Sequence, residues 1–225
     1  NTMGTIVHNT LEELYKPHIG IVLTEDILKN LIKGIEPEVR NQFKLEYGLT
    51  HIQEGKNKII YAVICRYVHN YLKREISLLK KGDVVIIQAV EDDLRDIPLT
   101  DTVSLRGKVD LVEQRNGNLN IVDYKTGKVA QTDLNLKSYE DLLLPEGKFE
   151  KAFQVLMYAY MLNKKKPLSF PVSAGIISFK NLQSGFLAFK YNKNQEITAE
   201  TLLEFEAVLK RLVKEILDPS IPFTE

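Results

Sequence analysis

The dipeptide Asn116-Gly117 constrains the fold of this chain most, because it separates two segments in which apolar and polar residues alternate. A two-residue type I′ turn needs positive φ at both central positions, and Asn followed by Gly is the strongest short signal for it. The sequence therefore predicts a β-hairpin with Arg115 opposite Asn118. Counting back along both strands from that pair places Asp110 directly opposite Asp123.

Two carboxylates facing each other across a hairpin need compensation, because Cβ atoms of such pairs lie only about 5 Å apart and like charges there are destabilising. One carboxyl can stay protonated, a basic side chain can intervene, or a divalent cation can sit between the oxygens. Lys125 lies two residues after Asp123 and therefore shares its face of the sheet. Two carboxylates and a lysine suit metal-assisted phosphodiester hydrolysis. The alternative is a solvated surface hairpin whose strand ends carry charges.

The same register predicts a second pair of like charges, Lys108 opposite Lys125. We expect the strands to diverge at this point, or one of the two lysines to turn toward a phosphate.

Helices and strands alternate along the rest of the chain in an order typical of an α/β (α+β) fold with a central mixed β-sheet flanked by α-helices. Apolar residues at helical spacing predict helices, and a period of two predicts strands. We expect one domain over residues 1–225, cut from a longer polypeptide. Helices are predicted at 3–15, 24–33, 57–80, 149–162 and about 202–216, strands at 84–90, 103–113, 118–124, 172–179 and 185–190, and a connection without clear period at 126–148, a possible flap.

Composition narrows the classes of partner and cofactor. The 30 basic and 30 acidic residues cancel, so nucleic-acid binding would depend on a local patch. Cys65 is the only cysteine, which excludes a disulfide framework, a cysteine-based zinc site and an iron-sulfur cluster within this chain. The sequence contains neither a run long enough to cross a membrane nor a signal peptide, so we expect a cytoplasmic protein without membrane contact.

Four motifs resemble those of the PD-(D/E)xK nuclease superfamily and, within it, of RecB-like (AddB-like) nuclease domains. They occur in family order: Gly4-Thr5-Ile6-Val7-His8, Gly107-Lys108-Val109-Asp110, Ile121-Val122-Asp123-Tyr124-Lys125-Thr126-Gly127, and Gln154-Val155-Leu156-Met157-Tyr158. The similarity extends from residue 4 to about 190 and implies a restriction-endonuclease-like core.

The resemblance also implies roles for individual residues. His8, Asp110, Asp123 and the backbone carbonyl of Tyr124 would bind Mg²⁺ or Mn²⁺, and Lys125 would be the catalytic lysine. Gln154 and Tyr158, with Lys151 on the same helical face, would position the DNA backbone. Glu91, at the end of the first predicted strand, matches an acidic position of the family, and Lys108 lies beside the first aspartate. The implied activity is DNA exonuclease activity in double-strand break repair or recombination, with a helicase domain or subunit outside this chain.

Two other interpretations remain open on the sequence. The fold could serve as an inactive DNA-binding or scaffolding module, or as a stand-alone restriction-type endonuclease. His8 alone would more often be an ordinary helix residue than a metal ligand. The basic residues Lys73, Arg74, Lys80 and Lys81 are typical of a solvated helix end, which is the interpretation that we favour for them from sequence.

Overall fold

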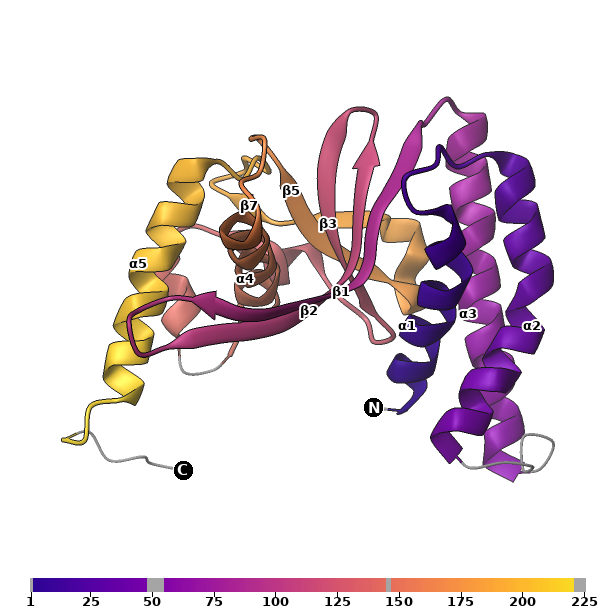
Figure 1. The fold of residues 1–225 in the computed structure, drawn as a ribbon, viewed down its shortest axis with the longest axis horizontal. Helices are drawn as coiled ribbons and strands as arrows, with labels where there is room; N and C mark the ends of the chain where they lie inside the picture. Colours follow the sequence, from indigo (N-terminus) through magenta and orange to yellow (C-terminus); the bar gives the residue numbers. More distant parts are fainter. Residues whose placement is uncertain (1, 48–54, 145–146, 221–225) are drawn as a thin grey trace. The chain divides into compact units, whose positions relative to one another are not determined.

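A computed structural model describes residues 2–47, 55–144 and 147–220 of the chain. The chain divides into two compact units, which are described separately. The first unit consists of residues 1–92, 109–129 and 176–186, and the second of residues 93–108, 130–175 and 187–225. The order of the elements along the chain can be followed in Figure 1.

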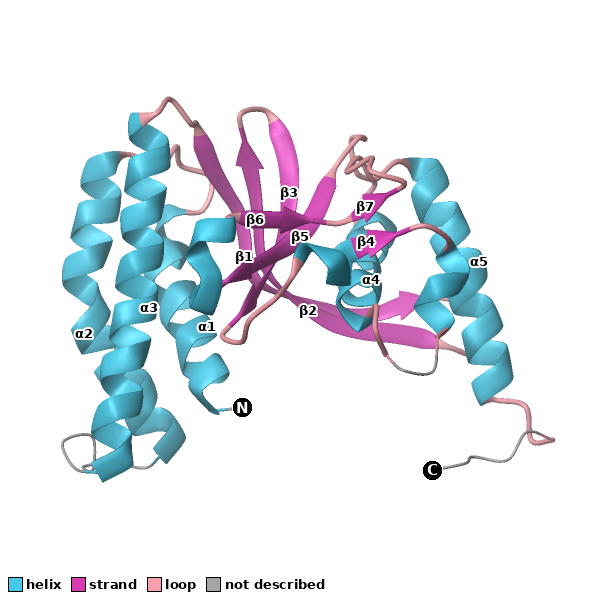
Figure 2. Ribbon diagram, turned by 180° about the vertical axis from the view of Figure 1, so that it is seen from behind, coloured by secondary structure: helices cyan, strands magenta, loops and turns pink. Residues whose placement is uncertain are grey.

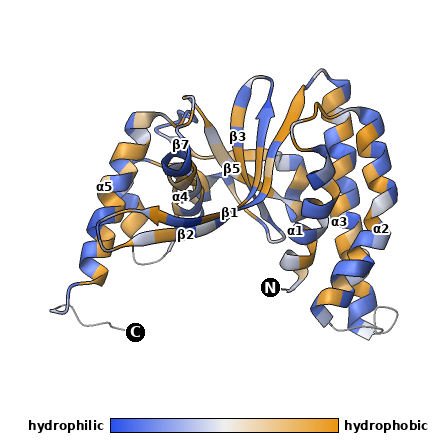
Figure 3. Ribbon diagram, in the orientation of Figure 1, coloured by the Kyte–Doolittle hydropathy of each residue, from blue (hydrophilic) through white to orange (hydrophobic). Residues whose placement is uncertain are grey.

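Three helices, α1 (Thr2–Tyr15), α2 (Glu25–Tyr47) and α3 (Gly55–Lys80), lie side by side in the first unit (Figure 2). Each has apolar residues along one side and polar residues along the other, so both hydropathy colours run along α2 and α3 in Figure 3. Their buried side chains share one core with strand residues Val85, Ile87, Leu111 and Val122. This core supports the strands that carry the predicted site.

The prediction of a short helix at 24–33 was wrong about its length, because α2 continues to Tyr47 through Gly34 and Pro37. Thr24 does cap its start, by accepting a hydrogen bond from the backbone N–H of Ile27. Burial of Ile35, Val39 and Phe43 continues the apolar stripe beyond the proline, and this packing outweighs the local preference of Gly and Pro to end a helix.

The main sheet has five strands in the order β1-β2-β3-β5-β6. They are β1 (Val85–Pro98), β2 (Ser104–Arg115), β3 (Asn118–Lys125), β5 (Ser173–Ser178) and β6 (Phe186–Ala188). The fold is a mixed sheet flanked by α-helices, as predicted.

The hairpin between β2 and β3 has the predicted turn and register. Asn116 and Gly117 both have positive φ, at 54° and 85°. The described antiparallel pairs run from Arg115 opposite Asn118 to Leu111 opposite Val122. Asp110 and Asp123 are the next positions in that register. One local dipeptide was therefore sufficient to predict which residues meet across these two strands.

The first strand is longer than predicted, since β1 continues to Pro98 instead of ending near residue 90. Its second half is polar, EDDLRD, and contains two residues with positive φ, Glu91 and Asp96. Such conformations are uncommon for residues with a side chain. Because this half of β1 is polar and its backbone is irregular, it lacks the alternation of apolar and polar residues by which a strand is predicted.

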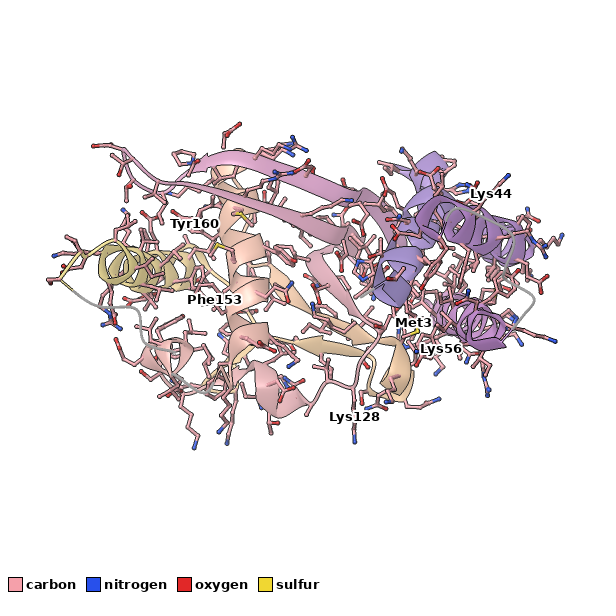
Figure 4. The ribbon with its side chains drawn as sticks, turned by 90° about the horizontal axis from the view of Figure 1, so that it is seen from below. Met3, Lys44, Lys56, Lys128, Phe153 and Tyr160 are labelled. Atoms are coloured by element: carbon pink, nitrogen blue, oxygen red, sulfur yellow. The ribbon has the colours of Figure 1, made fainter. Side chains whose placement is uncertain are left out.

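The second unit contains α4 (Glu150–Lys165) and α5 (Ala199–Ile216), which pack against each other through Phe153, Tyr160 and Phe205. Figure 4 shows Phe153 and Tyr160 along α4. The connection at 126–148 is more regular than predicted: it holds 3-10 helices η3 (Gln131–Leu134) and η4 (Tyr139–Leu143) and a short strand, β4 (Asn135–Leu136). The predicted strand at 185–190 is divided, because β7 (Lys190–Tyr191) pairs in parallel with β4 in a second, two-stranded sheet.

In the described part of the chain, no helix combines the length and the apolar character needed to span a membrane.

Candidate metal centre and active site

Six of the predicted site residues, His8, Glu91, Asp110, Asp123, Tyr124 and Lys125, belong to the first unit. They come from α1, β1, β2 and β3. Asp110 and Asp123 are both buried, with 7% and 2% of their surface exposed. Burial of two carboxylates in one core is costly unless cations or hydrogen bonds compensate for it. The surroundings of these two aspartates therefore decide what the site can do.

The imidazole of His8 lies between two carboxylates. Its Nδ1 atom is 3.3 Å from Oδ1 of Asp110 and 3.4 Å from Oε1 of Glu91. One ligand atom from each of the three residues falls within 4.8 Å of the others, so they form a group that could hold a metal ion. Glu91 had the weakest sequence signal of the three, and the structure places its carboxylate beside His8.

The backbone of Glu91 is strained, with φ at 47° inside a strand. A non-glycine residue in this region costs on the order of 1 kcal/mol or more and persists only where its surroundings hold it there. The side chain of Glu91 is 6% exposed and contacts His8. Strain of this kind is concentrated at functional sites, which supports Glu91 as a site residue although no sequence pattern predicts its conformation.

Asp123 is paired with Lys125, two residues further along the same face of β3. The Nζ atom of Lys125 donates a hydrogen bond to Oδ1 at 3.1 Å and lies 2.8 Å from Oδ2. Burial, and then the charge of Asp110, raise the pKa of Asp123 to about 6, although Lys125 and His8 oppose the shift. The two aspartates therefore repel each other, as the predicted apposition requires.

Burial alone would lower the pKa of His8, but its contacts with Asp110 and then Glu91 outweigh burial and raise the pKa to about 10. In the metal-free protein the imidazolium of His8 thus supplies positive charge beside the carboxylates of Asp110 and Glu91. A metal ion at Nδ1 would have to displace that proton.

The backbone of Tyr124 connects the two sides of the site. Its N–H donates to Oδ2 of Asp110 at 2.6 Å, and its carbonyl oxygen accepts from Nε2 of His8 at 3.0 Å. The carbonyl therefore accepts a hydrogen bond from Nε2 of the ring, whereas the carboxylates of Asp110 and Glu91 lie beside Nδ1. Its role as a metal ligand stays a prediction, since in this arrangement it orients the ring of His8.

The side chain of Tyr124 points into the core, away from Asp123 and Lys125, as alternation along a strand requires. Its hydroxyl shares a buried 2.8 Å hydrogen bond with the hydroxyl of Tyr71 on α3. The rings of Tyr71, Tyr124 and Phe179 pack against one another. Tyr71 lies within the helix predicted at 57–80, and no sequence signal identifies its partner on β3.

The donor set fits a divalent cation. The Oδ2 atom of Asp123 is buried, and the ammonium group of Lys125 lies 2.8 Å from it. Glu91 and Asp110 supply further carboxylate oxygens, the ligand type that hard cations prefer, and His8 supplies a nitrogen. A cation would relieve the repulsion between these carboxylates.

Four predicted residues belong to the second unit: Lys108, Lys151, Gln154 and Tyr158. On α4, the Nε2 amide group of Gln154 donates a 2.7 Å hydrogen bond to the hydroxyl of Tyr158, so the two act as one polar group. A Cβ atom at Gly107 would lie 3.8 Å from the ring of Tyr158 and 2.5 Å from Met161. The small residue in the motif before Asp110 therefore allows α4 to approach β2 closely.

The other two residues of this group are Lys151 and Lys108. Lys151 forms ion pairs with Asp133 and Glu150, at 3.7 and 3.4 Å. Lys108 is exposed on β2.

The mixed sheet and its group of carboxylates, histidine and lysine define an α/β protein with a candidate metal site. The family model of the PD-(D/E)XK nuclease superfamily matches residues 1–225. The chain therefore belongs to the PD-(D/E)XK nuclease superfamily, a group of metal-dependent nucleases. No match was found among curated proteins, and none among solved structures.

Proposed function

We propose that this protein is a Mg²⁺- or Mn²⁺-dependent deoxyribonuclease of the RecB-like (AddB-like) branch. It would act as a cytoplasmic exonuclease in double-strand break repair or recombination, together with a helicase domain or subunit outside this chain. The observation that carries the proposal is the convergence of His8, Glu91 and Asp110 beside the Asp123–Lys125 pair. The motif Asp123-Tyr124-Lys125-Thr126-Gly127 supports the RecB-like branch.

In this proposal His8, Glu91, Asp110 and Asp123 hold the ion. The ion supplies Lewis acidity and lowers the pKa of bound water. Tyr124 orients two of the ligands through its backbone, because its N–H fixes Asp110 and its carbonyl fixes His8. Gln154 and Tyr158 position the DNA strand, and Lys108 and Lys151 are further candidates for contacts with its phosphates.

Lys125 has two tasks that depend on its distance to Asp123. Without a cation its ammonium group neutralises the aspartate at 2.8 Å. If Asp123 held a cation, the ammonium group of Lys125 would be able to orient the attacking water or to stabilise charge that develops on the phosphate. Net reaction is hydrolysis: water adds to phosphorus, one P–O bond breaks, and the leaving oxygen takes up a proton.

The test uses linear and closed-circular DNA incubated with the protein in Mg²⁺, in Mn²⁺ and in EDTA. We expect linear DNA to be degraded from its ends only when metal is present. Lys125→Met should abolish cleavage but retain metal binding, measured by isothermal titration with Mn²⁺. Its control is Lys128→Met, a neighbouring exposed lysine outside the site, which should cut normally.

Other outcomes identify the other candidates. Cutting of closed circles would support a stand-alone endonuclease. Binding of Mn²⁺ and DNA without cleavage under any of these conditions would overturn the proposal in favour of an inactive module.

A further inference from the structure

The C-terminal half of α3 borders a cavity whose charged lining residues are all basic. The cavity has a volume of about 440 Å³ and lies between α3 and the 3-10 helix η5 (Phe179–Ser184). It is lined by Asn70, Lys73, Arg74, Ser77, Leu78, Lys81, Leu182 and Gln183. No carboxylate is among them, and Asn70, Ser77 and Gln183 add neutral hydrogen-bond donors.

The lysines of this cavity lack acidic partners. Lys73 and Lys81 are exposed, and neither forms an ion pair with any residue that the structure describes. Arg74 contacts the buried carboxylate of Glu75 at 2.9 Å. Lys80 lies 3.8 Å from Glu25 of α2, outside the cavity lining. Cations are common in the last turn of a helix because they interact with its dipole, but Lys73 lies two turns before the end.

The spacing of the lysine and serine side chains in this cavity matches a chain of phosphate groups. Lys73 and Ser77 lie four residues apart on one side of α3, and Lys81, the residue after the helix ends, continues this spacing. Eight residues of α-helix span about 12 Å. Successive phosphates of a DNA strand advance by about 3.4 Å along the axis, so the two lysines span about three to four nucleotides.

The cavity and the metal centre belong to the same compact unit. Phe179 of η5 packs on Tyr67 and Tyr71 of α3 and on Tyr124 of β3, with ring centroids 5.3 to 6.1 Å apart. In addition, the hydroxyl of Ser178 donates a 2.7 Å hydrogen bond to the carbonyl of Gly127. These contacts hold α3, η5 and the end of β3 together.

From this arrangement we infer that the α3–η5 cavity is a binding site for the phosphate backbone of DNA, separate from the metal centre. The identity of the ligand rests on the proposed function. In a chain without net charge, this cavity supplies the local positive patch that nucleic-acid binding requires. Its lysines hold the strand at a fixed position relative to the metal centre, without contacting the reacting phosphate.

The experiment compares Lys73→Gln/Lys81→Gln with a matched control, Lys33→Gln/Lys44→Gln, which removes two exposed lysines from α2. Lys44 is labelled on the outer surface of α2 in Figure 4. Binding of fluorescein-labelled single-stranded and duplex DNA is measured by anisotropy in EDTA over a range of salt concentrations. Unchanged thermal unfolding verifies that both variants are folded.

We expect the cavity variant to bind DNA roughly 10- to 100-fold more weakly at about 0.1 M salt, with a salt slope smaller by about 2. The control should bind like the wild-type protein. With Mg²⁺ or Mn²⁺, the cavity variant should show a higher KM for DNA and an unchanged kcat.

Two outcomes would overturn the inference in different ways. If the wild-type protein binds and cuts DNA but the two variants bind equally well, the cavity is not a DNA site and the proposed nuclease function stands. If the wild-type protein binds anionic vesicles or acidic peptides but no DNA, the inference and the proposed function both fail.

Discussion

Asp123→Asn in the metal-free protein tests the electrostatic basis of the site, because the substitution removes one buried negative charge and keeps the shape of the side chain. The pKa of Asp123 is raised from 3.8 to about 6. Since one pKa unit corresponds to about 1.4 kcal/mol, the ionised carboxylate destabilises the folded state by about 3 kcal/mol at pH 7. This penalty already includes the opposing attraction of Lys125, so we expect a net gain of about 1–3 kcal/mol in the free energy of unfolding.

The pH dependence follows from the direction of the shift. The folded protein binds the proton of Asp123 more tightly than the unfolded chain does. This tighter proton binding therefore stabilises the folded protein fully below pH 3.8, and the stabilisation is lost as the pH rises through about 6. The difference between Asp123→Asn and wild type should be small near pH 4 and reach its full size near pH 7.

The measurement is urea unfolding followed by circular dichroism, in EDTA, from pH 4 to pH 8. Asp101→Asn, an exposed aspartate in the loop between β1 and β2, is the control and should follow the wild-type curve. Saturating Mn²⁺ should reverse the order, since an ion bound only to the folded state stabilises it by about 2.7 kcal/mol at 100 times its Kd. A metal-free Asp123→Asn protein clearly less stable than wild type at pH 7 would refute the account of two repelling carboxylates.

Three further substitutions test the packing that supports the site. Arg115→Met removes the guanidinium group that pairs with the buried carboxylates of Glu75 and Glu113, although Glu75 keeps its contact with Arg74. Urea titrations should show that the free energy of unfolding at pH 7 falls by about 3–5 kcal/mol. Tyr71→Phe removes the hydrogen bond to the Tyr124 hydroxyl and should cost about 1 kcal/mol in the same assay, while raising the Mn²⁺ concentration needed for half-maximal cleavage. Gly175→Ala would place a Cβ atom 2.3 Å from the carbonyl oxygen of Leu187 and should lower the free energy of unfolding by about 1–3 kcal/mol or more; an unchanged thermal midpoint would contradict this close approach of β5 and β6.

The parts of the fold that the sequence predicts are those determined by local chemistry. A two-residue turn determines the β2–β3 register, and with it the neighbourhood of Asp110 and Asp123. The extent of α2 depends instead on tertiary packing: a Cβ atom at Gly34 would lie 3.2 Å from a methyl group of Leu14, so the glycine brings α1 and α2 close together. Local propensity marks Gly34 as a possible helix end and carries no information about its neighbour on α1.

The residues of the candidate site also divide into those that the local sequence predicts and those that depend on tertiary structure. Asp123 and Lys125 are recognisable because their spacing on one strand places them on one face. Glu91 was a weak candidate, because its position beside His8 depends on a positive φ within β1. Tyr71 was missed altogether, since a buried tyrosine on an apolar helix face has the same sequence signature whether or not its hydroxyl bonds to another strand.

Charge is separated within the first unit, and in the proposed function this separation would allow a chain without net charge to bind DNA. The carboxylates of Glu91, Asp110 and Asp123 exceed the cations of His8 and Lys125, so the metal-free centre repels phosphate. The α3–η5 cavity carries the opposite sign and needs no metal to attract it. A phosphate backbone held there would remain bound while the centre exchanges its ion. Metal should therefore affect cleavage far more than affinity, whereas neutralising Lys73 and Lys81 should affect affinity far more than the rate of the chemical step.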